Sequence, residues 1–167
     1  MKTLMLLRHA KAGFDLSGQA DAERVLTHAG KQDAIKLAYK LKGRNHKVDL
    51  FYCSAATRTR QTLDVITEIV SHSANIEILG SLYQASEETV LDVIKGTPNR
   101  LSTIMLIGHN PAMTQLSNLL ASDLRLDHLP CCGLVVITFD ALNWEQLQVG
   151  SGEVAWFDIP KNDYSIL

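Results

Sequence analysis

The stretch LMLLRHAK, residues 4–11, joins an apolar run directly to a cluster of basic side chains. The four apolar residues 4–7 are typical of a short strand that is buried on both faces of a sheet. The interior of a buried strand does not accommodate unpaired charges, so Arg8, His9 and Lys11 must lie at or beyond the end of the strand. The stretch therefore predicts a strand that brings basic groups to one edge of a sheet.

Strand and helix patterns alternate after this stretch through the first two-thirds of the chain. Strands are predicted at residues 48–53, near 76–79 and at 103–107, and the last of these has the pattern of a buried strand. Helices are predicted from Thr27 as N-cap to about Lys42 with Gly43 just past the end, from Ala55 to about Val70 with Ser54 as cap, over Glu87–Lys95, and from Pro111 with Asn110 as cap. Such alternation predicts a mainly parallel sheet with helices on both faces.

Two further segments complete the expected fold. Residues 10–26 show neither helical nor strand periodicity and are predicted to form a long loop, of a length that is often functional in compact domains. Residues 134–139 and 145–149 are predicted to pair as an antiparallel C-terminal hairpin, which 154–157 would extend. The expected fold class is α/β, a three-layer α/β/α sandwich, in a single domain over residues 1–167.

The composition narrows the classes of function. The formal net charge is only −2 at pH 7, so we expect no general attraction for nucleic acid or an anionic membrane, and any anion site must be local. The three cysteines do not suggest a disulfide framework, which suits a reducing compartment. The apolar run near the N-terminus is too short for a signal peptide or a membrane span, so the cytoplasm is the expected location.

Three of the predicted strands end in groups that bind anions. The first strand ends at Arg8 and His9, the second is followed about one helical turn later by Arg58, and the 103–107 strand leads into a turn that contains His109. Ligands of such sheets bind beyond the C-terminal ends of the strands, so these side chains should converge. Two guanidinium forks, two imidazoles and the N-termini of helices describe a cradle for a phosphoryl group.

The motifs at these strand ends resemble those of the histidine phosphatase superfamily, which has the phosphoglycerate-mutase-like fold. The matching stretches are LRHAK (7–11), SAATRTRQT (54–62) and GHNP (108–111). Ala55 stands where the family usually has Pro, and Thr59 where it usually has Ala. Within the superfamily the chain is most similar to the SixA type of phosphohistidine phosphatase, also through ERVLTHAG (23–30), in which Val25 replaces a Pro.

The resemblance implies a two-step phosphatase mechanism. His9 would attack phosphorus and form a phosphohistidine enzyme, which water then hydrolyses. The oxygens of the phosphoryl group would be held by Arg8, Arg58 and His109, with Asn110 and Lys11 as further phosphate-binding residues. Phosphate or sulfate would occupy the same site. We expect no cofactor and no metal, because the sequence offers no carboxylate cluster for Mg²⁺.

The sequence defines the general acid and the substrate less sharply than the nucleophile. Many family members supply a Glu in the region of Glu87 and Glu88, but these two residues are expected in the first turn of a helix, where acids are common. An imidazole leaving group needs protonation less than an alkoxide does, and no large insertion would cover the site. We therefore expect the substrate to be phosphohistidine on a partner protein in signal transduction. A phosphomonoesterase for small esters and a non-catalytic module for phosphorylated ligands are the alternatives.

Two other sites can be drawn around the cysteines, and neither fits its pattern. Cysteine phosphatases use C-x5-R, whereas CSAATR (53–58) has four residues between its Cys and its Arg and contains no glycine. A loop of that length does not surround a phosphate with its N–H groups. A zinc site at His128, Cys131 and Cys132 lacks a second paired motif, and its two cysteines are adjacent.

Overall fold

A single mixed sheet forms the centre of the molecule. The computed structural model describes residues 1–14, 18–70 and 73–161, and within these ranges the sheet has six strands in the order β3-β2-β4-β1-β5-β6. The strands are β1 (Lys2–Arg8), β2 (Leu50–Ser54), β3 (Asn75–Leu79), β4 (Thr103–Gly108), β5 (Leu134–Phe139) and β6 (Gly152–Asp158). The first four are parallel, and β5 and β6 are antiparallel to their neighbours.

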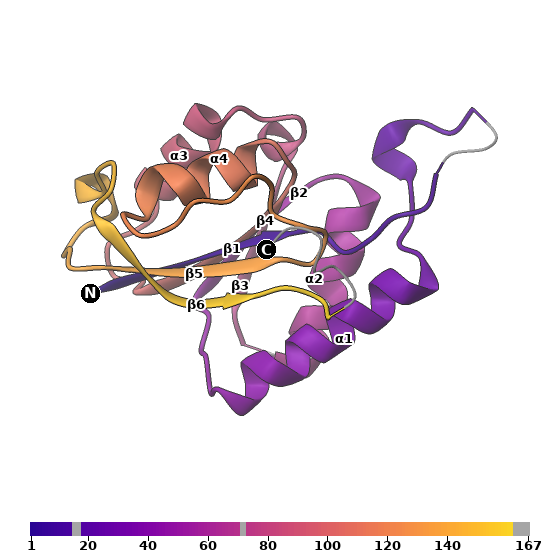
Figure 1. Ribbon diagram of the computed structural model, residues 1–167, viewed down its shortest axis with the longest axis horizontal. Coiled ribbons are helices and arrows are strands. Elements are labelled where there is room, and N and C mark those ends of the chain that lie inside the picture. The colour runs from indigo at the N-terminus through magenta and orange to yellow at the C-terminus, as the bar shows by residue number, and fades with distance from the viewer. Residues whose placement is uncertain (15–17, 71–72, 162–167) are drawn as a thin grey trace.

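Helices cover both faces of this sheet, which gives the expected three-layer α/β/α sandwich (Figure 1). The helices are α1 (His28–Gly43), α2 (Thr57–Val70), α3 (Glu87–Lys95) and α4 (Ala112–Leu120). Helices α1 and α2 lie on one face, and α3 and α4 lie on the other (Figure 1). Three short 3-10 turns, η1 (Asp21–Glu23), η2 (Gly80–Leu82) and η3 (Trp144–Gln146), interrupt the connections.

Strand β1 has no solvent-exposed apolar face. Leu4 and Leu6 belong to the core beneath α3 and α4, while Met5 and Leu7 belong to the core beneath α1 and α2, and all four are 0% exposed. Successive side chains of a strand point to opposite faces, so the continuous apolar run predicted burial on both sides. Full burial of each large apolar side chain stabilises the fold by roughly 2 kcal/mol. The strand is therefore a rigid base for the residues at its end.

The three strands that carry the site motifs are parallel neighbours. Strand β4 lies between β1 and β2, and the register pairs Arg8 with Gly108 and Cys53 with Ile107. The three strands therefore end at the same edge of the sheet. This arrangement confirms the expected convergence of the motifs at the C-terminal strand ends.

Three helix boundaries differ from the prediction. Helix α1 includes Gly43, while its predicted cap, Thr27, does accept from the Gly30 N–H. Helix α2 begins at Thr57, because Ser54 continues β2. The Ser54 side chain accepts from the Ala56 N–H within the turn. Ser54 pairs with Leu79 in the sheet, so the chain turns at residues 55–56 before α2 begins.

Helix α4 also begins later than predicted, because Pro111 is its N-cap and Ala112 its first residue. The predicted cap, Asn110, lies one position before the actual N-cap, and its side chain still accepts from the Thr114 N–H at 3.2 Å. The sequence thus identified the side chain that binds the helix N-terminus and misplaced the helix start by one residue.

The strand predicted at residues 145–149 is wrong. Residues 145 and 146 belong to the 3-10 turn η3, and 147–149 form no regular element. Asn143 and Gln146 make reciprocal capping bonds at this turn, and Trp144 is fully buried. The indole N–H of Trp144 donates to the Leu101 carbonyl at 2.8 Å. Burial of one large aromatic residue outweighs the strand-like alternation of its neighbours. The partner of β5 is instead β6, which contains the predicted 154–157 stretch.

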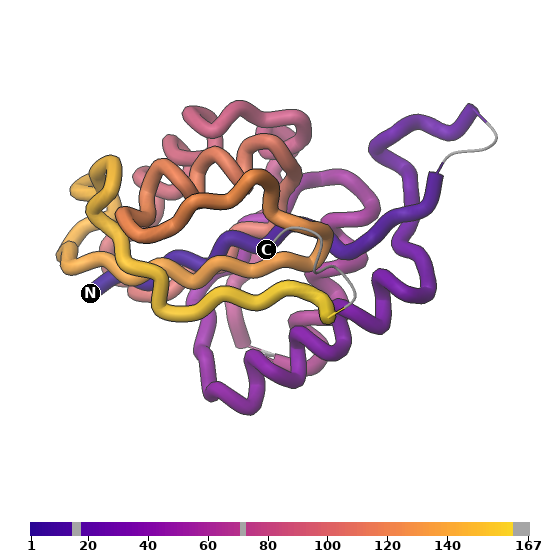
Figure 2. The backbone as a smooth tube through the Cα atoms, in the orientation of Figure 1, coloured from indigo at the N-terminus to yellow at the C-terminus, as the bar shows by residue number. Residues whose placement is uncertain are grey.

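The predicted loop at 10–26 extends beyond the end of β1 (Figure 2). Its two arms meet at an antiparallel bridge between Ala12 and Leu26, and the returning arm contains η1. Residues 15–17 of this prediction lie outside the described residues. The loop therefore has one short helical turn that the sequence pattern did not indicate, and that turn lies next to the strand ends.

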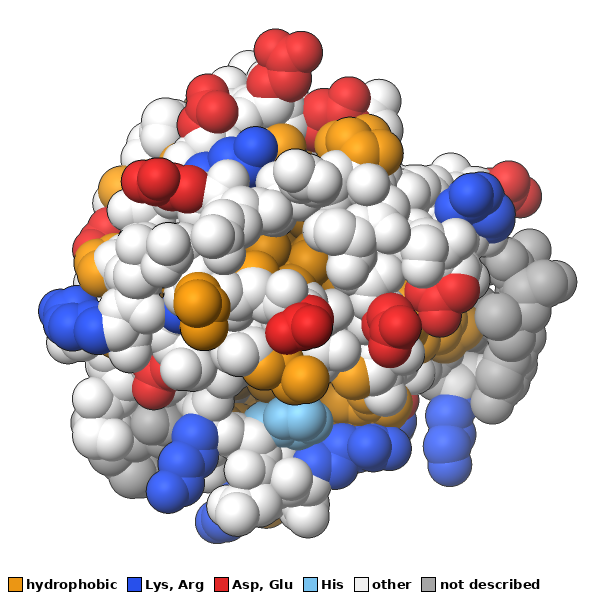
Figure 3. All heavy atoms as spheres, turned by 90° about the vertical axis from the view of Figure 1, so that its left-hand side faces the viewer, with side chains coloured by type: hydrophobic (Ala, Val, Ile, Leu, Met, Phe, Trp, Pro, Cys, Tyr) orange, Lys and Arg blue, Asp and Glu red, His pale blue; other side chains and the backbone are white. Residues whose placement is uncertain are grey.

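The opposite end of the molecule, where the parallel strands begin, carries both signs of charge. Acidic side chains lie mainly in the upper part of this face and basic ones mainly in the lower part (Figure 3). Basic and acidic side chains alternate with uncharged ones on this face, so it has no continuous basic surface (Figure 3). Among the described residues, no helix combines the length and the apolar character needed to cross a bilayer.

Candidate active site

His9 follows the last residue of β1 and is held in one tautomer. Its side chain is buried, and the Nδ1–H donates to the carbonyl oxygen of Ala10 at 2.8 Å. Nε2 therefore carries the lone pair, and Arg58 Nε donates to it at 3.3 Å. Burial lowers the pKa of His9 to about 3, and the neighbouring His109, Arg58 and Arg8 disfavour its protonated form further. The imidazole is therefore neutral at pH 7, with a nucleophilic nitrogen directed toward Arg58.

Arg58 lies in the first turn of α2 and is almost fully buried. Its guanidinium uses two edges. The edge formed by Nε and Nη2 faces His9 Nε2 at 3.3 Å and His109 Nδ1 at 3.4 Å. The edge formed by Nη1 and Nη2 donates to the backbone oxygen of Asp21 at 2.8 Å and to its carboxylate at 3.1 Å. A planar fork of this kind suits the oxygens of a phosphoryl group.

His109 follows β4 and faces His9 across the site. The two ring centroids lie 5.3 Å apart with a tilt of 57°. His109 Nε2 lies 2.7 Å from Ser54 Oγ, a side chain with no exposed surface at the end of β2. Because Arg58 can only donate, His109 Nδ1 acts as acceptor toward it and Nε2–H donates to Ser54. Burial, together with the charge of Arg58, lowers the pKa of His109 to about 4.

Arg8 brings a third basic group from the last position of β1. Its Nη1 donates to the carbonyl of Leu129 at 3.0 Å, which fixes the side chain from one end. Its Nε is buried and has no hydrogen-bond partner among the described residues. A buried donor without an acceptor is costly unless a ligand satisfies it. Arg8 lines the same hollow as His9, so an anion bound there would supply the missing acceptor.

Four residues, Arg8, His9, Arg58 and His109, which we call the quartet, line a hollow of about 360 Å³ on the surface. Its wall also contains residues of the 10–26 loop and the segment before β5. The described lining residues are Arg8, His9, Lys11, Ala12, Phe14, Arg24, Arg58, His109, Asn110 and Cys131. Exposed Lys11 and Phe14, the latter 88% exposed, form part of the rim. The hollow is of a size that suits a phosphoryl group and the first atoms of its leaving group.

Asn110 reaches the hollow, but its amide takes part in the fold. Its Nδ2 donates to the Leu129 carbonyl at 2.8 Å, and its Oδ1 accepts from the Thr114 N–H and hydroxyl. The same Leu129 carbonyl accepts from Arg8, so Asn110 and Arg8 share one anchor. A role of Asn110 in binding phosphate stays a prediction.

Glu87 and Glu88, the predicted sources of a general acid, lie in the first turn of α3. Glu87 is half-buried and Glu88 is exposed. Neither belongs to the described residues that line the hollow. Acidic side chains at a helix N-terminus interact favourably with the helix dipole and stabilise the helix, which is a sufficient reason for the position of Glu87 and Glu88.

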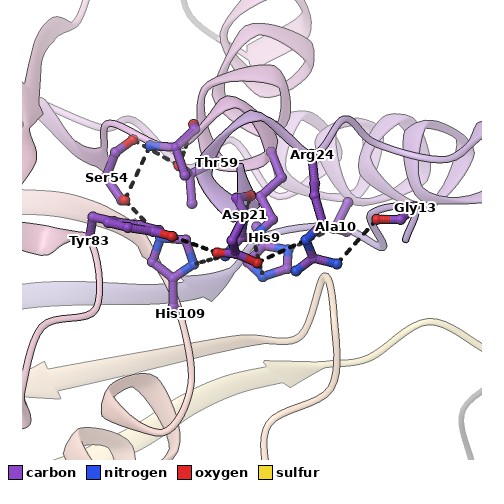
Figure 4. A network of polar contacts seen from close by, with 11 residues as sticks. His9, Ala10, Gly13, Asp21, Arg24, Ser54, Thr59, Tyr83 and His109 are labelled. Carbon is purple, nitrogen blue, oxygen red and sulfur yellow. Dashed lines mark hydrogen bonds and ion pairs between the residues drawn. The ribbon is translucent and has the colours of Figure 1, made fainter. Parts of the chain in front are cut away.

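Sequence reasoning missed three residues that contact the quartet. Asp21 binds Arg58, Tyr83 packs edge-on to His109 with ring centroids 5.6 Å apart, and Ser54 binds His109. Figure 4 shows these residues as one connected network around the two histidines. Asp21 and Tyr83 lie in segments without periodicity, so no pattern in the sequence marks them. The sequence predicted Ser54 as a helix cap. Its position directly after the predicted strand 48–53, which ends at the site, is the signal that could have marked it as a site residue.

The structure argues against the two cysteine-based sites. Cys53 is fully buried, its Sγ donates to the Ser54 carbonyl, and burial raises the pKa of the thiol to about 12. A thiol with that pKa is not a nucleophile at neutral pH. Among the described residues, no group of three or more His, Cys, Asp or Glu side chains is arranged to hold a metal, and this includes the set of His128, Cys131 and Cys132.

Comparison with known sequences agrees with this geometry. The sequence profile of the histidine phosphatase superfamily (branch 1) matches residues 4–83, a range that contains His9 and Arg58. An uncharacterized protein of Mycobacterium tuberculosis is 30% identical over 164 residues, which cover 93% of this chain and 100% of the relative. The chain belongs to the histidine phosphatase superfamily.

Solved structures place the chain beside the SixA type within that superfamily. A candidate SixA phosphohistidine phosphatase from Nakamurella multipartitia superposes with a TM-score of 0.84 and 27% identity, covering 96% of each chain. A candidate SixA from Agrobacterium tumefaciens gives a TM-score of 0.81 and 28% identity, covering 95% of this chain and 98% of the other. The fold is phosphoglycerate-mutase-like, and the chain is SixA-like.

Proposed function

We propose that this protein is a phosphatase that uses His9 as nucleophile and removes the phosphoryl group from phosphohistidine on a partner protein. The observation that carries the proposal is the state of His9. Its Nδ1–H donates to the Ala10 carbonyl, and its Nε2 keeps a lone pair that accepts from Arg58 Nε at 3.3 Å, beside a hollow with further cationic donors. A nucleophilic imidazole requires this tautomer, with the opposite nitrogen directed to the ligand.

The proposed reaction has two steps. In the first, the His9 Nε2 lone pair forms a bond to phosphorus while the bond between phosphorus and the substrate nitrogen breaks. The electron pair goes to the leaving imidazole, which takes a proton from water. In the second step, water attacks the phosphorus of phospho-His9, the bond from phosphorus to Nε2 breaks and its electron pair returns to the ring. The proton lost by the attacking water neutralises the hydroxide left from the first step, so inorganic phosphate and neutral His9 are the products. Arg8 and Arg58 stabilise the negative charge on the equatorial oxygens in both transition states.

The ionisation state of Asp21, whose carboxylate contacts Arg58, argues for a substrate whose leaving group needs no strong acid. Tyr83 and Arg58 bind Asp21 and lower the pKa of its carboxyl to about 2. The group is therefore ionised at neutral pH and does not donate a proton to an alkoxide. A nitrogen leaving group departs more readily than an alkoxide, which favours phosphohistidine over a phosphate ester.

The rim of the hollow favours a substrate that is presented on a surface. Phe14 and Lys11 are exposed beside the quartet, and both can contact the surroundings of a phosphorylated side chain. We further propose that the partner is a signalling protein and that Lys11 contacts the phosphate. The proposal also includes a single domain and a cytoplasmic location. No metal and no cofactor takes part in the proposed steps.

The test compares two substrates and two proteins. Wild type and His9→Ala are incubated with a phosphohistidine-bearing phosphotransfer protein and, separately, with p-nitrophenyl phosphate. We expect wild type to prefer the phosphoprotein and His9→Ala to lose activity by at least about 100-fold on both. A strong preference for p-nitrophenyl phosphate would identify a small-ester phosphomonoesterase instead. Tight binding of phosphate without turnover of either substrate would identify a binding module.

A further inference from the structure

Asp21 holds the edge of Arg58 that points away from the two histidines. Its backbone oxygen accepts from Nη1 at 2.8 Å, and its carboxylate accepts from Nη2 at 3.1 Å. The other edge of the guanidinium remains directed at His9 and His109. The Nη1–Nη2 edge of the guanidinium is thus bound by Asp21, while the adjacent Nε–Nη2 edge faces the histidines, where a ligand would bind.

The Asp21 carboxylate is itself fixed from two sides. The Tyr83 hydroxyl donates to Oδ2 at 2.6 Å, and Arg24 Nε donates to Oδ1 at 2.9 Å (Figure 4). Oδ2 therefore accepts from Tyr83 and Arg58 together. Arg24 also reaches the Gly13 carbonyl at 3.1 Å, which connects the two arms of the loop. A carboxylate with so many donors has one preferred orientation, although the side chain is half-exposed.

We propose that Asp21, clamped by Tyr83, is a positioning residue that orients Arg58 so that its Nε and Nη2 face the transferred phosphoryl group. The inference rests on the proposed function, since it gives Asp21 and Tyr83 a supporting role in the same reaction. Asp21 acts through Arg58 and does not touch the reacting atoms. Arg58 has a long and flexible side chain, and without an outer partner its fork would sample several orientations. A displacement of about 1 Å in such a group costs on the order of 100-fold in rate.

The carboxylate could in principle compete with phosphate for Arg58, and the geometry separates the two effects. Asp21 takes the outer edge, while the inner edge is the one that faces the nucleophile. Positioning predicts that loss of the carboxylate lowers kcat. Competition predicts that loss of the carboxylate tightens phosphate binding and leaves kcat unchanged.

The experiment replaces the carboxylate with its neutral isostere, Asp21→Asn, in the full chain. We expect kcat to fall about 10- to 100-fold, with KM and the inhibition constant of inorganic phosphate within about 3-fold of wild type. The variant Tyr83→Phe keeps the ring against His109 and removes only the hydroxyl, so a smaller fall of about 3- to 10-fold in kcat is expected. Thermal denaturation establishes that each variant is folded.

Glu23→Gln is the matched control, because it removes one acidic charge from the same turn η1 without touching Arg58. Its kcat should equal that of wild type. The inference is overturned if Asp21→Asn has the kcat of wild type, or if Glu23→Gln reproduces its loss. Wild type tests the proposed function separately. If wild type forms no phosphoenzyme with phosphoramidate, that function fails, whereas an active wild type with an equally active Asp21→Asn refutes the positioning role alone.

Discussion

Burial keeps His9 and His109 uncharged even at mildly acidic pH, where an exposed histidine carries a proton. Burial is the main cause of both lowered pKa values, and the charge of Arg58 lowers each of them further. The arginines supply the positive charge of the site, and the imidazoles stay neutral beside them. In the proposed reaction, the cations that bind phosphate would therefore also keep His9 unprotonated for attack.

Ser54 should matter for activity at the scale of one hydroxyl group. Ser54→Ala removes the 2.7 Å partner of His109 Nε2 and leaves that side of the ring without a hydrogen bond. We expect kcat to fall roughly 10-fold, because the ring is then held only from its Nδ1 side and its orientation is less fixed. Steady-state kinetics with a phosphohistidine substrate measures the effect.

Ser117→Ala is the control for this change. Ser117 is equally buried and donates to the Met113 carbonyl inside α4, away from the hollow. It should lower thermal stability by a similar amount and leave kcat unchanged. Equal activity of the two variants would contradict the role of Ser54 as a partner of His109.

At the scale of elements, the N-terminus of α1 is locked to the loop that follows β1. A Cβ atom on Gly30 would lie 2.2 Å from the Lys11 carbonyl oxygen, and that oxygen accepts from the Thr27 N–H at 2.9 Å. The absence of a side chain at Gly30 thus allows the close approach. The approach sets the direction in which the chain leaves His9 and Ala10.

Gly30→Ala should therefore destabilise the fold although Ala favours helices. The new methyl group meets backbone, which cannot rotate away, so we expect a loss of about 1–3 kcal/mol in the free energy of unfolding. Gly43→Ala at the other end of α1 meets no atom within 4 Å and should be neutral or stabilising by up to about 1 kcal/mol. Urea denaturation of both variants tests this. A stable Gly30→Ala variant with wild-type activity would show that the contact with Lys11 is loose.

At the scale of the whole molecule, the buried histidines connect folding to pH. Unfolded histidine has a pKa of about 6.5, while in the fold the pKa is about 3 for His9 and about 4 for His109. As the pH falls below about 6.5, the unfolded chain takes up protons that the folded chain does not. The free energy of unfolding should therefore decrease, by at most about 2.7 kcal/mol per pH unit from these two groups. Burial also lowers the pKa of His46, which acts in the same direction.

Chemical denaturation at about pH 5, 6 and 7 measures this slope. His9→Gln should reduce it by up to half, because one of the two site histidines is gone. A stability that does not change over this range would contradict the neutral, buried state of the two imidazoles.

The parts of the molecule that the sequence predicted are those determined by local pattern. The run at Leu4–Leu7 indicated a strand buried on both faces, and the placement of Arg8, His9, Arg58 and His109 followed from the rule that parallel strands share one edge. These residues belong to short contiguous motifs at strand ends, so one rule located them all.

The parts that the sequence did not predict depend on contacts between distant segments. Asp21 meets Arg58 across 37 positions and Tyr83 across 62, and neither separation leaves a pattern. Trp144 turned a strand-like segment into a 3-10 turn by packing into the core, a tertiary effect that local alternation cannot express. The outer support of the site is therefore visible only in the fold.

The most direct test of the central claim identifies which nitrogen of His9 carries the phosphoryl group. Wild-type protein is mixed with phosphoramidate, quenched rapidly in base and analysed by ³¹P NMR and by peptide mass spectrometry. The Nδ1–H bond to the Ala10 carbonyl predicts a phosphoryl group on His9 Nε2, labile in acid and absent from His9→Ala. A phosphoryl group on Nδ1, on Cys53 or on no residue of the wild-type protein would contradict the account.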